Sequence, residues 1–121
     1  MLDTLGLKEL LACLLTRHHS GFVRERYLPS LLSCDHPWVT PFVVSLVGEY
    51  VIEIIRLIRD DIHRLDPTIY RDFLMRNPAF HKMTKERVMS YWNCYHSGES
   101  KEDYAGFQIL EFFDSLTPNL G

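Results

Sequence analysis

The chain has 121 residues, a hydrophobic content of 46% and a formal net charge of −3 at pH 7. This length fits one domain, residues 1–121, which can bury enough surface to fold without disulfides or a metal. The negative charge argues against a dedicated nucleic-acid-binding protein, since such proteins need a strongly basic surface. The acidity is concentrated in residues 94–121, where Lys101 is the only Lys or Arg, and it is expected to form a solvated helix face.

Cysteine usage and hydropathy indicate where the protein resides. The three cysteines are odd in number and widely spaced, which is typical of reduced thiols in a cytoplasmic protein; they are Cys13, Cys34 and Cys94. No basic segment precedes the first leucines, so a signal peptide is not expected. Pro41 and Gly48 interrupt the longest apolar stretch, and we therefore expect neither a membrane span nor a membrane partner.

Apolar residues recur with helical spacing, and no segment shows the alternation that is typical of strands. Residues 37–63 would make a helix of about 40 Å, too long for a compact domain, so two antiparallel helices that separate at Gly48 are expected. The other expected helices cover residues 4–17, 21–33 (kinked or shortened at Pro29), 67–76, 78–96 and 103–116. The predicted fold class is all-α, with six or seven helices in antiparallel pairs.

Two dipeptides mark helix starts, because proline is favoured in the first helical turn after a capping residue. They are Asp66-Pro67 and Asn77-Pro78. The residues of 78–96 expected to point inward, fully or in part, are Phe80, Met83, Val88, Tyr91, Trp92 and Tyr95. The apolar residues expected in the last helix are Tyr104, Phe107, Leu110, Phe113 and Leu116.

Two segments carry a family resemblance: SGFVRERYLPSLL (20–32) and PWVTPFVVSLVGEYVIEIIRLI (37–58). With Val23-Arg24 near the start of one helix and Gly48-Glu49-Tyr50-Val51 at a turn, they resemble the HEAT-like helical repeats. The resemblance covers about a third of the chain, and Ile54-Ile55 stands where a second Val-Arg pair is usual. It implies an α-solenoid, with a plain helical bundle as the alternative, and a concave surface that binds proteins or peptides.

Two Cys-x-His pairs raise the alternative of a metal- or small-ligand-binding protein. Cys34 and His36 form one pair, and Cys94 and His96 form the other. Four such ligands could hold zinc, but the spacing is shorter than usual, and a cysteine beside a capping histidine is the favoured interpretation. The chain contains no nucleophile elbow, phosphate-binding loop or dinucleotide motif. We therefore expect no metal, no cofactor and no enzymatic activity.

The remaining candidates are residues for binding a partner. Tryptophan, tyrosine and arginine are enriched at binding hot spots, and an acidic residue lies beside the expected turn. The candidate residues are Arg24, Trp38, Glu49, Tyr50 and Trp92. For Trp92 a core position is the alternative, and the favoured one. The sequence thus predicts a small protein–protein interaction module that neutralises or scaffolds a partner, with a homo-oligomeric structural subunit as a further alternative.

Overall fold

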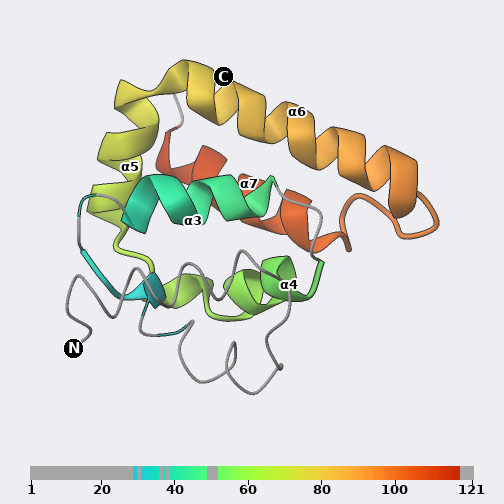
Figure 1. The fold of residues 1–121 in the computed structure, drawn as a ribbon, viewed down its shortest axis with the longest axis horizontal. Helices are drawn as coiled ribbons and strands as arrows, with labels where there is room; N and C mark the ends of the chain where they lie inside the picture. Colours follow the sequence, from blue (N-terminus) through green and yellow to red (C-terminus); the bar gives the residue numbers. More distant parts are fainter. Residues whose placement is uncertain (1–28, 30, 36, 38, 49–51, 118–121) are drawn as a thin grey trace.

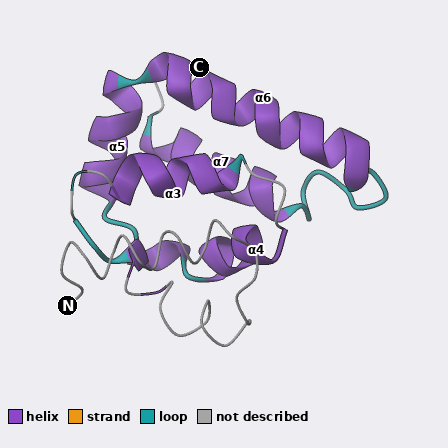
Figure 2. Cartoon of the chain, viewed as in Figure 1, coloured by secondary structure: helices purple, strands orange, loops and turns teal. Residues whose placement is uncertain are grey.

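All the regular structure in the described part of the chain is helical (Figures 1 and 2). The computed structural model describes residues 29, 31–35, 37, 39–48 and 52–117. Their elements are α3 (Val39–Val47), α4 (Ile52–Asp60), the 3₁₀ helix η1 (Ile62–Arg64), α5 (Pro67–Arg76), α6 (Pro78–Tyr95) and α7 (Ala105–Leu116). The all-α class is confirmed. The expected helix at 4–17 and most of that at 21–33 lie outside the described residues, so six or seven helices and the HEAT-like repeat stay predictions.

The expected break at Gly48 is confirmed. α3 ends at Val47 and α4 begins at Ile52, and the two helices run in opposite directions in Figure 1. The Gly48 N–H donates to the Ser45 carbonyl at 3.1 Å, which closes the last turn of α3. A Cβ at Gly48 would lie 3.2 Å from the Arg87 Cβ, so the absence of a side chain lets α6 pass close to this turn.

Both proline start signals are also confirmed, although only one residue caps as expected. The Asp66 carboxylate accepts hydrogen bonds from the Thr68 and Ile69 N–H groups at 2.9 and 3.2 Å, and Pro67 opens α5. Asn77 makes no side-chain cap on α6. Its side-chain amide instead donates to the Phe73 carbonyl at 2.9 Å, which gives a hydrogen-bond donor to one of the free carbonyl groups in the last turn of α5.

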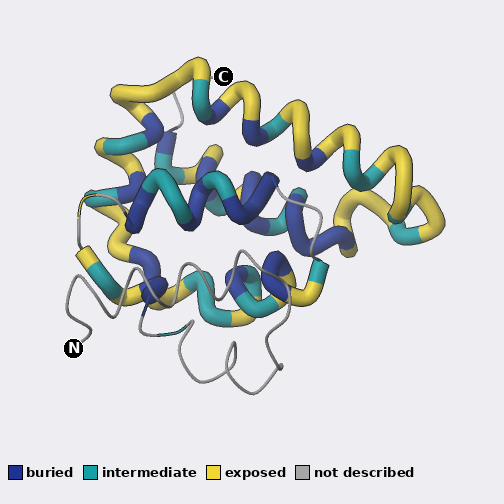
Figure 3. The backbone as a smooth tube through the Cα atoms, viewed as in Figure 1, coloured by how far each residue is buried: buried dark blue, intermediate teal, exposed yellow. Residues whose placement is uncertain are grey.

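The core lies where α3 and α7 meet the other helices. α3 and α7 each pack against α4, α5 and α6. Figure 3 shows the buried positions of these helices facing inward, while the outer side of α6 is exposed. The largest fully buried side chains are Tyr70, Tyr104, Phe113, Leu31, Leu32, Ile55, Ile58, Leu74, Ile109 and Val39. None of the helices in the described part of the chain is both long and apolar enough to cross a membrane.

The expected inward face of α6 is wrong in part. Tyr95 is 74% exposed and Met83 is 39% exposed, while His81 and Thr84 are buried beside Val88. Figure 1 shows α6 extending well past the end of α3, so its last turn does not pack against α3. Thr84 is accommodated because its hydroxyl donates to the Phe80 carbonyl at 3.0 Å.

Candidate partner-binding groove

Of the five residues expected to bind a partner, Trp92 is the one that the structure describes. Arg24, Trp38, Glu49 and Tyr50 lie outside the described residues. Trp92 is half-buried on α6 and packs against the core, with its ring edge-on to Phe107 at 5.9 Å between ring centroids. This placement agrees with the core alternative for Trp92, and it also puts the residue beside the surface described below.

Trp92 fixes the loop that joins α6 to α7. Its indole N–H donates to the Glu99 carbonyl at 2.8 Å. The Tyr104 N–H donates to the Ser100 carbonyl at 3.1 Å, and the Tyr104 ring lies 5.2 Å from that of His96. Burial raises the pKa of Tyr104, and the nearby Glu99 carboxylate raises it further. The loop is therefore held at several points, and α6 and α7 are connected by an ordered corner.

A groove opens on the surface between α6 and α7. Its volume is about 350 Å³, and its lining residues are Lys85 and Met89 of α6 with Phe107, Leu110, Glu111 and Asp114 of α7. A second hollow of about 200 Å³ is lined by Lys101, Glu102, Phe107, Gln108 and Glu111. Because the two hollows share Phe107 and Glu111, we treat them as one surface, called here the α6–α7 groove. Met89, 41% exposed, contributes with Phe107 and Leu110 to an apolar floor.

The charged residues of the groove are unequally compensated. Lys85 Nζ lies 2.7 Å from Asp114 Oδ1, so these two charges pair with each other. Lys101 Nζ lies 5.1 Å from the centroid of the Trp92 ring and 5.9 Å from that of Phe107. Among the described residues, neither Glu102 nor Glu111 has an ion-pair partner. With both lysines counted, the groove has three carboxylates (Glu102, Glu111 and Asp114) against two ammonium groups, so it carries a net negative charge around an apolar floor.

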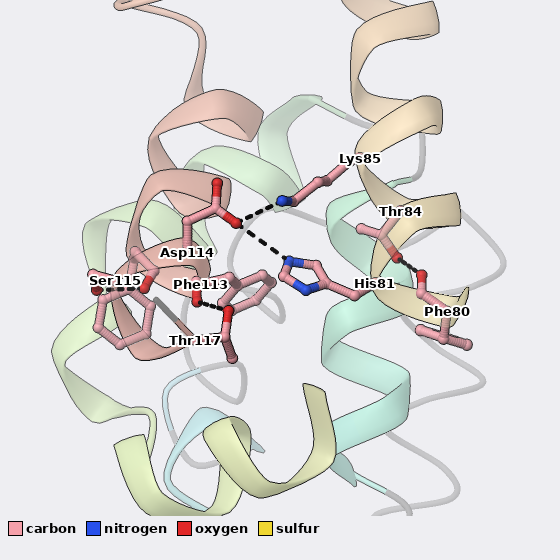
Figure 4. Close-up of polar contacts among 9 residues, drawn as sticks. Phe80, His81, Thr84, Lys85, Phe113, Asp114, Ser115 and Thr117 are labelled. Atoms are coloured by element: carbon pink, nitrogen blue, oxygen red, sulfur yellow. Dashed lines mark hydrogen bonds and ion pairs between the residues drawn. The ribbon is translucent and has the colours of Figure 1, made fainter. Parts of the chain in front are cut away.

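A buried histidine lies at one end of the groove, beneath the Lys85–Asp114 pair (Figure 4). The His81 side chain is only 4% exposed, and its Nε2 lies 3.7 Å from Asp114 Oδ1 without a hydrogen bond. Its ring stands edge-on to Phe113. Burial lowers the pKa of His81 and the Lys85 ammonium lowers it further, while Asp114 acts in the opposite direction. His81 is consequently mostly neutral at pH 7, and it lies beside the Lys85–Asp114 ion pair without a hydrogen bond to it.

Sequence reasoning missed His81 because a polar residue was not expected inside. One signal was available: the spacing of His81, Thr84 and Val88 puts these three residues on one helix face, so that burial of Val88 implies burial of the other two. Lys85 lies four residues after His81 and therefore shares its side of α6. The partner across the groove, Asp114, is not close in sequence, and it could not be paired with these residues from local spacing.

The zinc alternative raised by the Cys-x-His pairs finds no support among the described residues. Cys34 is half-buried and packs against the core, while Cys94 is exposed in the last turn of α6. Figure 1 places the segment before α3 and the C-terminal end of α6 on opposite sides of the fold. His36 lies outside the described residues. Within the described ranges, no three His, Cys, Asp or Glu residues are grouped to hold a metal ion.

Comparison with known proteins finds no matching family model, no similar curated protein and no similar solved structure. The interpretation of the α6–α7 groove therefore rests on its own geometry and charge.

Proposed function

We propose that this chain is a protein-interaction module and that the α6–α7 groove is its docking surface. The observation that carries the proposal is the apolar floor of the groove, where Met89 is exposed beside Phe107 and Leu110 between two packed helices. Apolar side chains exposed in a hollow and surrounded by charged residues are typical of surfaces that bind another protein. An ordered corner between α6 and α7 also favours binding, because a preorganised surface loses little conformational entropy.

A catalytic role for His81 and Asp114 fits the geometry less well than a binding role does. A general base must reach the proton that it removes. His81 Nε2 is buried beneath Asp114, and its side chain is 4% exposed, so a substrate in the groove would meet the carboxylate and not the imidazole. We therefore propose a role without catalysis or a cofactor, in which the module neutralises or scaffolds its partner.

A third hollow, separate from the α6–α7 groove, lies at the corner of α5 and α6, and it is the weaker docking candidate. Its volume is about 480 Å³, and its lining residues are Arg76, Asn77, Pro78, Ala79, Phe80 and Met83. The guanidinium of Arg76 is paired with Asp72 at 3.1 Å, so this hollow offers no uncompensated charge to orient a partner. The α6–α7 groove combines apolar surface with such charge, and it is preferred for that reason.

The proposal places the protein in the cytoplasm. The two cysteines that the structure describes, Cys34 and Cys94, are free thiols, which is usual for a reducing compartment. A second copy of the chain is an alternative occupant of the groove, and sedimentation at micromolar concentration distinguishes it, because a monomer would leave a different protein as the partner.

A pair of matched methionines tests the docking surface. Met89 and Met75 are each 41% exposed, but only Met89 lines the groove. Affinity purification from the native host would compare the wild type with Met89→Lys and Met75→Lys at equal expression, after circular dichroism confirms that all three are folded. We expect Met89→Lys to lose the bound protein by at least about tenfold, as for a hot-spot residue, and Met75→Lys to retain it. Equal retention by both variants would contradict the proposal.

A further inference from the structure

We infer that the partner of the α6–α7 groove is a cationic amphipathic helix, and that Lys101 occupies in the free protein the place that a lysine or arginine of that helix takes in the complex. The inference rests on the proposed function of this groove, and it names the chemistry of the partner. Three observations carry it: the shape of the groove, the sign of its uncompensated charge, and the position of Lys101 over two aromatic rings.

The shape of the groove suits a helix. The lining residues of α7 run from Phe107 to Asp114, which corresponds to about 10 Å along the helix axis at 1.5 Å per residue. α6 forms the other wall, and Figure 1 shows α6 and α7 running in opposite directions. The channel between two such helices receives the ridge of a third helix, whose apolar side chains recur every three or four residues. Two turns of a partner helix would cover the floor formed by Met89, Phe107 and Leu110.

The sign of the charge selects a cationic helix. The charge of Lys85 is paired with that of Asp114, whereas Lys101 keeps its positive charge, because the rings of Trp92 and Phe107 hold its ammonium group without neutralising it. The remaining charge of the groove is still negative, since two carboxylates lie in it beside Lys101. Glu102 and Glu111 have no ion-pair partner among the residues that the structure describes. An acidic helix would bring like charges together, whereas basic residues flanking an apolar stripe would pair with these carboxylates. The same negative charge disfavours an anionic membrane surface as the occupant.

Lys101 shows where one cation of the partner would bind. Its Nζ lies within 6 Å of both ring centroids, which is the range of a cation–π interaction. The residue is exposed, and its loop is held independently by the Trp92–Glu99 and Tyr104–Ser100 hydrogen bonds. The lysine side chain can therefore leave the rings without unfolding the loop. Because a cation–π contact at an exposed site is weak, a partner lysine or arginine can replace it at a small loss of affinity.

The test uses three model peptides of about 14 residues, four helical turns, with one shared leucine stripe. Their polar positions carry lysine, glutamine or glutamate, and affinity is measured by calorimetry with the full chain. We expect the lysine peptide to bind best and the glutamate peptide at least about tenfold more weakly. Met89→Lys should weaken binding of the lysine peptide, while Met75→Lys should leave its affinity unchanged. Lys101→Met should raise the affinity for the lysine peptide about threefold to fivefold, because the Lys101 ammonium group no longer competes with the peptide for the two aromatic rings.

Lys82→Met is the matched control for Lys101, since it removes the same charge from an exposed lysine that does not line the groove. We expect this control to change affinity by less than about twofold. If the glutamine peptide binds as tightly as the lysine peptide and remains sensitive to Met89→Lys, the groove is a docking surface but the cationic partner is wrong. If no peptide depends on Met89, both proposals fail. If Lys101→Met raises the affinity for the lysine peptide no more than Lys82→Met does, the place assigned to Lys101 is wrong.

Discussion

Substitution of Gly106 by alanine tests the packing that creates the groove. Gly106 is buried in the first turn of α7, against α6. A Cβ at this position would lie 2.7 Å from the Tyr104 Cε2 and 2.9 Å from the Val88 Cγ1. Tyr104 and Val88 are each only 1% exposed, so neither can move aside into solvent. The substitution must therefore displace α7 from α6 or distort the Tyr104 ring.

Two opposing effects set the magnitude. Adding a methyl group to a filled core destabilises a protein by about 1–3 kcal/mol. Replacing glycine by alanine inside a helix stabilises it by up to about 1 kcal/mol. The contacts at Gly106 are short and involve buried neighbours, so the first effect dominates, and a net loss of about 1–2 kcal/mol in the free energy of unfolding is expected. For a domain of this size that loss lowers Tm by about 5–10 °C.

Guanidinium denaturation followed by circular dichroism measures the change in the free energy of unfolding that Gly106→Ala causes. Gly98→Ala is the control. A Cβ at Gly98 would meet nothing within 4 Å, so this substitution should leave stability within about 0.5 kcal/mol or raise it slightly. The midpoint should fall for Gly106→Ala at an unchanged denaturant slope. If Gly106→Ala proves as stable as Gly98→Ala, the close packing of α7 on α6 is refuted.

Two further substitutions test the histidine beneath the groove and the cap of α5. The lowered pKa of His81 means that the unfolded chain takes up a proton first as pH falls below about 6.5, so the free energy of unfolding should decrease there. Denaturation at a series of pH values measures this decrease. It should be smaller in His81→Gln and unchanged in the control His63→Gln, which alters an exposed histidine. Identical pH profiles of the two variants would contradict the role given to His81. Asp66→Ala should lower the free energy of unfolding by about 1 kcal/mol through loss of two cap hydrogen bonds. Asp72→Ala, which removes an exposed ion pair, should lower it by less than about 0.5 kcal/mol, and equal losses would argue against the cap.

Local chemistry in the sequence was sufficient to locate several elements. Proline after Asp66 predicted the start of α5, and the glycine at position 48 predicted the break between α3 and α4. Apolar spacing predicted a last helix over 103–116, which the structure has as α7 (Ala105–Leu116), and three of its five expected apolar residues are buried: Tyr104, Leu110 and Phe113. These features depend on residues that lie within a few positions of one another, and such interactions can be inferred without knowing the tertiary fold.

The inner face of α6 could not be predicted in the same way. This helix carries apolar residues on several sides, so its pattern did not distinguish the buried face of Val88 from the exposed side of Met83. Neighbouring helices decide the matter, and they place the polar His81 inside.

The groove depends in the same way on pairs that are distant in sequence, such as Lys85 with Asp114. Trp92 was a candidate from its residue type, but its contacts with Glu99 and Lys101 follow from the path of the loop. The other expected binding residues, Arg24, Trp38, Glu49 and Tyr50, stay predictions.

The central claim is that a partner protein occupies the α6–α7 groove, and site-specific photo-crosslinking tests it most directly. Benzoylphenylalanine would be incorporated at position 89 in one sample and at the equally exposed position 75 in the other, in cells of the native host. The account predicts a crosslinked protein from position 89 alone, with the crosslink mapping by mass spectrometry to a basic amphipathic helix. Crosslinks from position 75 with none from position 89 would contradict it.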